Sequence, residues 1–215
     1  MGDVGLTALA IVVGYFVGTF PTAELVTRLA THGRVDIRTV GSGNPGGLNT
    51  MQTVGKAWGA LVILVDIVKG VIAGLLGWLI ADDAGAYGAA TAAIAGHIVP
   101  VWSRFRGGKG VATSGGAVLV TFPVYFPVEV AVAAFGALST RRAERAVLLT
   151  APVWISAALA WWLADLPNAW GPEPSVGLPI AAVASVAMIV TKFRLSADVP
   201  RPQTSPTDSV RPGRL

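Results

Sequence analysis

The sequence contains no cysteine, only two histidines and little charge for its length. Without cysteine there are no disulfides and no thiolate ligands for a metal, and two histidines give little support to a histidine metal site. We therefore expect no metal and no cofactor. Charged residues make up 13% of the chain, against about 25% in ordinary soluble domains, which excludes a conventional water-soluble core.

What the sequence has instead is long apolar runs, and hydrophobic residues make up 53% of it. A helix needs roughly 20 mostly apolar residues to cross the core of a bilayer, and lipid excludes open strands. We therefore predict an all-α membrane protein with residues 1–195 in a single polytopic domain. Seven transmembrane helices are expected, some of them short: Val4–Thr27, Ala57–Ile80, Ala86–Val101, Val111–Phe122, Pro123–Leu138, Ala146–Ala164 and Val176–Thr191.

The orientation follows from the charged residues between these spans. Seven crossings with the N-terminus outside place every lysine and arginine except Lys69 on the cytoplasmic side, as the positive-inside rule requires. The sorting depends on a tight turn at Pro123, because proline cannot continue the preceding helix. Five acidic residues then fall outside: Asp3, Asp82, Asp83, Asp165 and Glu173.

Two further predictions come from composition. Residues 196–215 are rich in Pro, Ser, Thr and Arg with little apolar content, and we expect a disordered cytoplasmic tail there. The net charge of +4 does not indicate nucleic acid, because the cations are spread over separate loops instead of gathering on one face with aromatic residues.

The first predicted cytoplasmic loop is rich in glycine. Its dinucleotide-type spacing lacks the strand that this fingerprint requires, so we set that interpretation aside. Successive glycines let backbone N–H groups turn inward around an anion, and nearby Ser and Asn side chains add donors. We expect a phosphate cradle here, with a flexible turn as the alternative. The candidates are Gly41, Gly43, Gly46 and Asn49 for phosphate binding, and Ser42 and Asn44 in the catalytic set.

The second predicted cytoplasmic loop combines glycines with cations at the start of a helix. It is not a Walker A loop, because Arg104 and Gly110 occupy positions where that motif needs Gly and Ser or Thr. A glycine pair with a lysine still makes a suitable cradle for an oxyanion, and a plain positive-inside loop is the alternative. We assign Lys109 to catalysis and these residues to phosphate binding: Arg104, Arg106, Gly107, Gly108, Gly110 and Thr113.

Five ionisable residues lie within the apolar runs, and for Glu24 and Glu129 we expect structural roles near the interface. Asp66 and Lys69 share one face of the second span, and such residues usually line a cavity, so we add them to the substrate-binding set. The alternative is a neutralising pair that fixes helix packing. His97 lies beside the second loop, either as a general base or hydrogen-bond donor to a ligand, or as a partner of nearby backbone.

A resemblance to a known family rests on three ordered segments: GSGNPGGLN, DIVKG and GHIVPVWSRFRGGKGVAT. With Gly14-Tyr15, Gly18-Thr19-Phe20-Pro21 and Asp36-Ile37-Arg38, they resemble the acyl-phosphate-dependent glycerol-3-phosphate acyltransferases of bacteria, the PlsY family. The resemblance is closest from Gly14 to Thr113.

The resemblance implies a seven-helix enzyme of the bacterial inner membrane whose active site faces the cytoplasm. Its substrates would be acyl phosphate and glycerol 3-phosphate, and its product lysophosphatidic acid, a phospholipid precursor. Association with the enzyme that makes acyl phosphate is a further implied partnership. An acyl phosphate is already activated, so such a protein need mainly hold two phosphates and an acyl carbonyl together.

The chain departs from the family pattern at three places. Leu48 stands where the family usually has Thr, and Gln52 where it has Arg. The segment Thr191–Asp198 lacks the expected His, Asn and Glu, and Lys192, Arg194 and Arg38 are candidates for replacement charge. The alternative function is therefore a non-catalytic or substrate-altered paralogue that binds phospholipid headgroups or a partner enzyme. A transporter is a third interpretation, suggested by Asp66 and Lys69.

Overall fold

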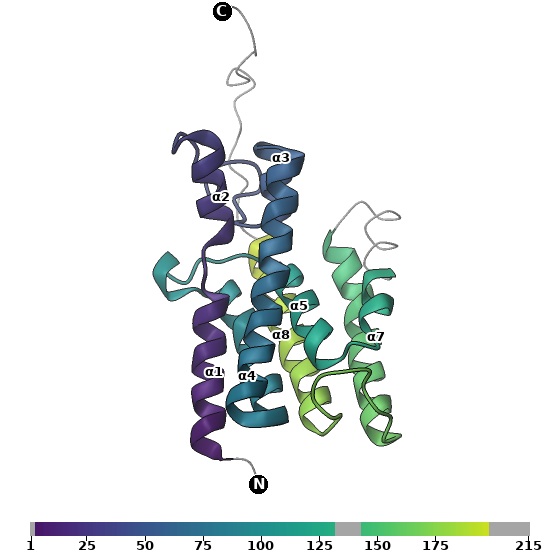
Figure 1. The fold of residues 1–215 in the computed structure, drawn as a ribbon. Helices are drawn as coiled ribbons and strands as arrows, with labels where there is room; N and C mark the ends of the chain where they lie inside the picture. Colours follow the sequence, from purple (N-terminus) through teal and green to yellow (C-terminus); the bar gives the residue numbers. More distant parts are fainter. Residues whose placement is uncertain (1–2, 132–142, 198–215) are drawn as a thin grey trace, which may run out of the picture.

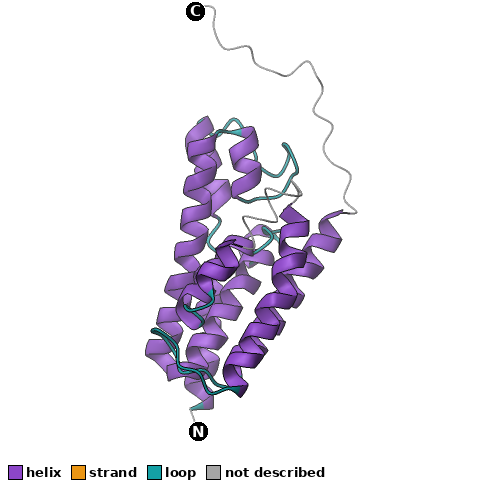
Figure 2. Cartoon of the chain, turned by 90° about the vertical axis from the view of Figure 1, so that its right-hand side faces the viewer, coloured by secondary structure: helices purple, strands orange, loops and turns teal. Residues whose placement is uncertain are grey.

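The computed structural model describes residues 3–131 and 143–197. Within these ranges every regular element is helical, which confirms the all-α prediction (Figure 1, Figure 2). Residues 126–131 are also helical. The remaining elements are α1 (Val4–Gly18), α2 (Thr22–Thr31), α3 (Gly47–Thr53), α4 (Lys56–Ile98), the short 3-10 helix η1 (Val101–Ser103), α5 (Val111–Thr121), α7 (Ala143–Leu163) and α8 (Gly177–Ala197).

The predicted first span, Val4–Thr27, is interrupted. α1 ends at Gly18, and α2 begins at Thr22 and stacks above it (Figure 1). The break arises because Pro21 cannot donate a backbone hydrogen bond and disfavours helical geometry at Phe20 before it. At the break the carbonyl of Phe20 accepts from the N–H of Thr22 at 2.9 Å, and it also accepts from a buried side chain described below.

α4 is two antiparallel arms joined by a tight turn. Ala81 and Asp82 have non-helical backbone angles, as the predicted break between Ile80 and Ala86 requires. The arms approach closely because Gly77 and Gly85 face each other: a Cβ on Gly77 would lie 2.2 Å from the carbonyl oxygen of Gly85. α4 contacts α1, α2, α3, α5 and α8, and so forms the centre of the bundle.

The later spans agree with the sequence prediction in place and order. α5 ends at Thr121, and the chain leaves the helix at Phe122, where Pro123 was expected to impose a break. α7 and α8 match the sixth and seventh predicted spans. The end of the fifth predicted span (132–138) lies outside the described residues, as do residues 198–215 of the predicted tail. α3, a helix of 7 residues after the first glycine loop, was not predicted.

Three helical segments in the described chain are long and apolar enough to cross a membrane: Val4–Thr31, Lys56–Ser103 and Gly177–Ser196. Many of their large apolar side chains are exposed, including Leu64 and Leu79 on α4 and Ile180 on α8. Apolar surface of this extent is stable in lipid and not in water. The chain is therefore an all-helical integral membrane protein.

Small residues set the distance between α1 and the second arm of α4. A Cβ on Gly14 would lie 2.3 Å from the carbonyl oxygen of Ala89, and a Cβ on Gly18 would lie 2.1 Å from that of Ala93. These glycines are four residues apart and occupy one face of α1, an arrangement typical of membrane helices that pack backbone to backbone. The close approach brings the end of α1 beside His97.

We expect Gly18→Ala to destabilise the fold, because the added methyl group meets the backbone of α4. Overpacking of this kind costs about 1–3 kcal/mol. Gly115→Ala is the matched control, since nothing lies within 4 Å of a Cβ on Gly115. Thermal unfolding in detergent, followed by tryptophan fluorescence, should show a lower midpoint for Gly18→Ala only. Equal midpoints would contradict the packing described above.

Candidate functional site

A cavity of about 520 Å³ lies where the first glycine loop, the second glycine loop and the end of α8 meet. Three cationic side chains line it, Arg38, Arg106 and Lys192, each from a different part of the chain. The hydroxyl of Ser42 and the amide of Asn44 face the same space. Among the described residues that line it there is no carboxylate. Such a cavity favours an anion, because phosphate oxygens accept hydrogen bonds from every one of these groups.

Arg38 is held in place by an ion pair with Glu24 in the first turn of α2. Glu24 lines a second, smaller cavity that shares Pro45 and Gly107 with the larger one. The break between α1 and α2 therefore orients a cation of the larger cavity. The sequence suggests Arg38 only as a source of the positive charge that is missing from the family pattern, because nothing in its local sequence shows which loop arginines face inward.

The first glycine loop is fixed by Asn49, which is 3% exposed. Its side-chain oxygen accepts from the N–H of Ser42 at 2.9 Å, and its Nδ2 donates to the carbonyls of Ile37 (3.0 Å) and Val40 (3.1 Å). These three hydrogen bonds use both N–H donors and the oxygen of the Asn49 side-chain amide. Asn49 therefore shapes the loop from within, and phosphate binding by Asn49 stays a prediction of the sequence.

The backbone of this loop does not form the expected cradle of N–H groups. The N–H of Gly43 donates to the carbonyl of Val40 at 2.9 Å, and that of Gly46 to the carbonyl of Asn44 at 2.9 Å. Gly41 is required for its left-handed φ of 58° and because a Cβ there would lie 2.2 Å from Oδ1 of Asn49. The glycines therefore allow the tight turn of the backbone, and Ser42 and Asn44 line the cavity.

The second glycine loop is closed in the same way. The N–H of Gly107 donates to the carbonyl of Ile98, and that of Gly108 to the carbonyl of His97, both at 3.1 Å. These two N–H groups are therefore not available to an anion, and Arg106 is the cation that this loop contributes to the cavity wall. Gly110 caps α5 with a φ of 81° and packs near Ile94 and Ile98, away from the cavity.

The other predicted residues of this loop lie outside the cavity wall. Arg104 is exposed and has a left-handed backbone. Thr113 is fully buried where α5 meets α4 and does not line the larger cavity. The ammonium of Lys109 lies 4.1 Å from the ring centroid of Phe193, the neighbour of Lys192 in α8. Lys109 therefore packs against α8 and is not among the residues that line the larger cavity.

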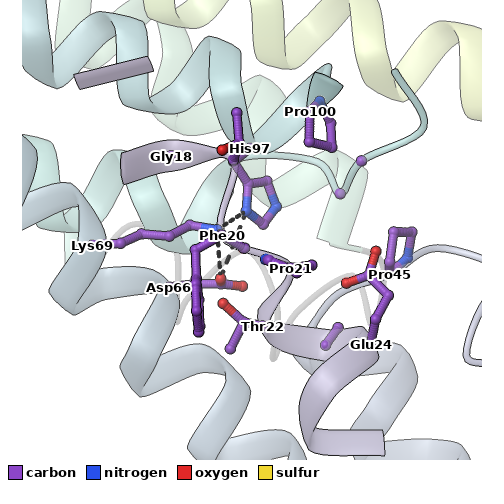
Figure 3. A pocket seen from close by; sticks show the side chains of 14 residues that line it. Gly18, Phe20, Pro21, Thr22, Glu24, Pro45, Asp66, Lys69, His97 and Pro100 are labelled. Atoms are coloured by element: carbon purple, nitrogen blue, oxygen red, sulfur yellow. Dashed lines mark hydrogen bonds and ion pairs between the residues drawn. The ribbon is translucent and has the colours of Figure 1, made fainter. Parts of the chain in front are cut away.

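Asp66, Lys69 and His97 form a buried cluster beside the smaller cavity (Figure 3). The Lys69 ammonium lies 2.9 Å from Oδ1 of Asp66 and 2.7 Å from Nδ1 of His97, and it donates to the Phe20 carbonyl at 3.3 Å. The smaller cavity holds about 10 Å³, roughly the space of one water. Asp66 and Lys69 thus form an ion pair within the protein, which supports the packing alternative.

The departures from the family pattern fall in two environments. Leu48 and Gln52 are both exposed on α3 and do not line the larger cavity. On α8, Lys192 lines that cavity and Arg194 does not, although sequence analysis could not separate the two. Lys192 and Arg194 differ in this way because residues two positions apart on a helix point in nearly opposite directions.

Comparison with known proteins identifies the family. The family model described as Glycerol-3-phosphate acyltransferase matches residues 8–201. A glycerol-3-phosphate acyltransferase of Exiguobacterium sibiricum is 47% identical over 55% of this chain and 56% of its own length. Glycerol-3-phosphate acyltransferase 2 of Bacillus cereus is 40% identical over 71% of this chain and 76% of its own length. The chain thus spans little more than half of the first relative.

Two crystal structures of PlsY (YgiH), an integral membrane glycerol 3-phosphate acyltransferase, have the same fold. The glycerol 3-phosphate form has a TM-score of 0.71 at 27% identity and covers 89% of this chain and 90% of that chain. The lysophosphatidic acid form has a TM-score of 0.72 over similar shares. With the family model matching most of its length, the chain belongs to the glycerol-3-phosphate acyltransferase family.

Proposed function

We propose that this protein transfers a fatty acyl group from acyl phosphate to the 1-hydroxyl of sn-glycerol 3-phosphate, which gives lysophosphatidic acid. The observation that carries the proposal is the cavity with three cations, a hydroxyl and an amide and no described carboxylate in its wall. Membership of the family supports the reaction class. The likeness to the glycerol 3-phosphate form of PlsY supports the choice of acceptor.

The reaction needs little from the protein beyond placement and charge. The acceptor hydroxyl oxygen attacks the acyl carbonyl carbon, the bond from that carbon to the phosphate oxygen breaks, and the hydroxyl proton leaves on the released phosphate. No protein base is consumed in this scheme. Arg38, Arg106 and Lys192 would offset the phosphate charge, and Ser42 and Asn44 would orient oxygen atoms.

The proposal places this site on the cytoplasmic side of a bacterial inner membrane in a protein with seven crossings. The starts of α1 and α8 and the turn of α4 lie at one end of the bundle, and α2 and α3 lie at the other (Figure 1). The cavity cations belong to the second end, and the sequence places Asp3 and Asp82 at the first. The positive-inside rule then orients the cavity toward the cytoplasm.

The two alternative functions have less support than acyl transfer. A transporter was suggested by Asp66 and Lys69 within a span, and these two residues pair with each other at 2.9 Å. A non-catalytic paralogue was suggested by Leu48, Gln52 and the altered segment Thr191–Asp198. Leu48 and Gln52 lie outside the larger cavity, whereas Lys192 of that segment supplies a cation to its wall. Binding of a phospholipid headgroup without turnover remains the competing outcome of the assay below.

Purified protein in detergent, given palmitoyl phosphate and labelled glycerol 3-phosphate, should produce labelled lysophosphatidate. Palmitoyl coenzyme A in place of palmitoyl phosphate should give none. Lys109→Ala should abolish the reaction, because it removes the lysine of the second glycine loop that the sequence assigns to catalysis. Absence of product from wild-type protein with an intact melting transition would contradict the proposal, and calorimetric binding of glycerol 3-phosphate without turnover would favour the non-catalytic paralogue.

Lys192→Met should raise the KM for glycerol 3-phosphate about 10- to 100-fold, since a hydrogen bond to a charged group contributes about 1.5–3 kcal/mol. We assign this cavity to the soluble substrate because Ser42 and Arg106 are exposed there. Arg194→Met on the same helix is the matched control and should leave KM nearly unchanged. Equal rises in both variants would indicate a general effect of charge and contradict a specific contact.

A further inference from the structure

The tautomer of His97 is determined by its buried neighbours. Lys69 and Asp66 are 6% and 3% exposed at their side chains, so water does not supply their hydrogen bonds. An ammonium has three N–H donors and no acceptor. The three acceptors around Lys69 are Oδ1 of Asp66, the carbonyl of Phe20 and Nδ1 of His97 (Figure 3). Their number matches the three donors of the ammonium.

Because the ammonium cannot accept, Nδ1 of His97 is the acceptor of the 2.7 Å bond and carries no proton. If His97 were an imidazolium, its Nδ1–H would point at an N–H of Lys69, so that two donors would face each other. A neutral lysine beside an imidazolium is also disfavoured, because Nδ1 is 3.6 Å from Oδ1 of Asp66, too far for a hydrogen bond, whereas Lys69 is at 2.9 Å. His97 is therefore neutral, with its proton on Nε2.

The Nε2 edge of the ring faces the junction of the two glycine loops. A Cβ on Gly108 would lie 2.2 Å from Nε2 of His97 and 2.8 Å from the carbonyl oxygen of Pro45. His97 also anchors the second glycine loop through its backbone, since its carbonyl accepts from the N–H of Gly108 at 3.1 Å. Pro45 and Gly107 line both cavities, so the junction forms the wall between the buried cluster and the proposed substrate site.

We propose that the Lys69–Asp66 pair fixes His97 as a neutral imidazole protonated on Nε2, and that His97 positions the junction of the two glycine loops as a hydrogen-bond donor. It does not act as a general base. A base must accept a proton from the substrate, and the accepting nitrogen of His97 points to Lys69, away from the larger cavity. The positioning role rests on the proposed acyl transfer, whereas the tautomer does not.

The tautomer can be read directly, because the chain has only two histidines. In a His32→Asn background, ¹⁵N-histidine labelling leaves His97 as the single reporter. Asn suits position 32 because that residue is exposed and has a left-handed φ of 51°. We expect the protonated ring nitrogen to be the one coupled to both ring C–H protons, which identifies Nε2. A protonated Nδ1, or protons on both nitrogens, would overturn the proposal.

The effect of the pair is tested by the double variant Asp66→Asn/Lys69→Met, which removes both charges together and avoids a lone buried ion. It should give a mixture of tautomers if it folds, and a spectrum identical to that of the parent would overturn the assigned cause. If it does not fold, Lys69→Arg serves instead: it retains the charge and donors, and should keep the proton on Nε2.

The exclusion of a general base has a kinetic readout. His97→Gln retains a donor near the Nε2 position, and we expect kcat to fall less than about tenfold, whereas loss of a general base typically costs about 10²–10⁴-fold. A fall in kcat of about 10²–10⁴-fold, with an unchanged melting transition, would overturn the conclusion that His97 is not a general base. If wild-type protein shows no acyl transfer while Nε2 is protonated, the proposed function fails and the tautomer assignment stands.

Discussion

The burial of one ammonium group organises the centre of this protein. Lys69 joins the first arm of α4 to His97 at the end of the second arm and to the Phe20 carbonyl at the break between α1 and α2. Removing one partner of a buried ion pair is strongly destabilising, because the other charge is left without compensation. The break, the end of α4 and the glycine loop that follows it are therefore held in a single arrangement.

Close helix packing makes this cluster possible. Gly14 and Gly18 let α1 approach the second arm of α4 backbone to backbone, and Gly70 and Gly116 do the same between α4 and α5. Lipid offers no hydrophobic drive for helices to associate, so such contacts and buried polar bonds carry more of the stability. The side chains of one helix then reach the carbonyls of the next.

The cavity is built from side chains because the loop backbones are already satisfied. Asn49 and the carbonyls of Val40, His97 and Ile98 take up the N–H groups expected to face an anion. Saturated loops are rigid, and rigid loops hold Ser42 and its neighbours in fixed positions. The positive charge of the cavity then comes from Arg38, Arg106 and Lys192, which lie in three separate parts of the chain. This arrangement suits a phosphate that enters from the water side.

The sequence by itself determined the helical membrane fold, the order of the apolar segments and the two loops that meet at the site, because hydrophobic runs, proline and glycine act locally. It could not determine which polar groups face inward. Asn49 and Thr113 look like ligands in sequence but are buried elsewhere, while Lys192 and Arg38 reach the cavity. Only the tertiary structure decides this, since the partners that consume or free each donor lie far apart in the chain.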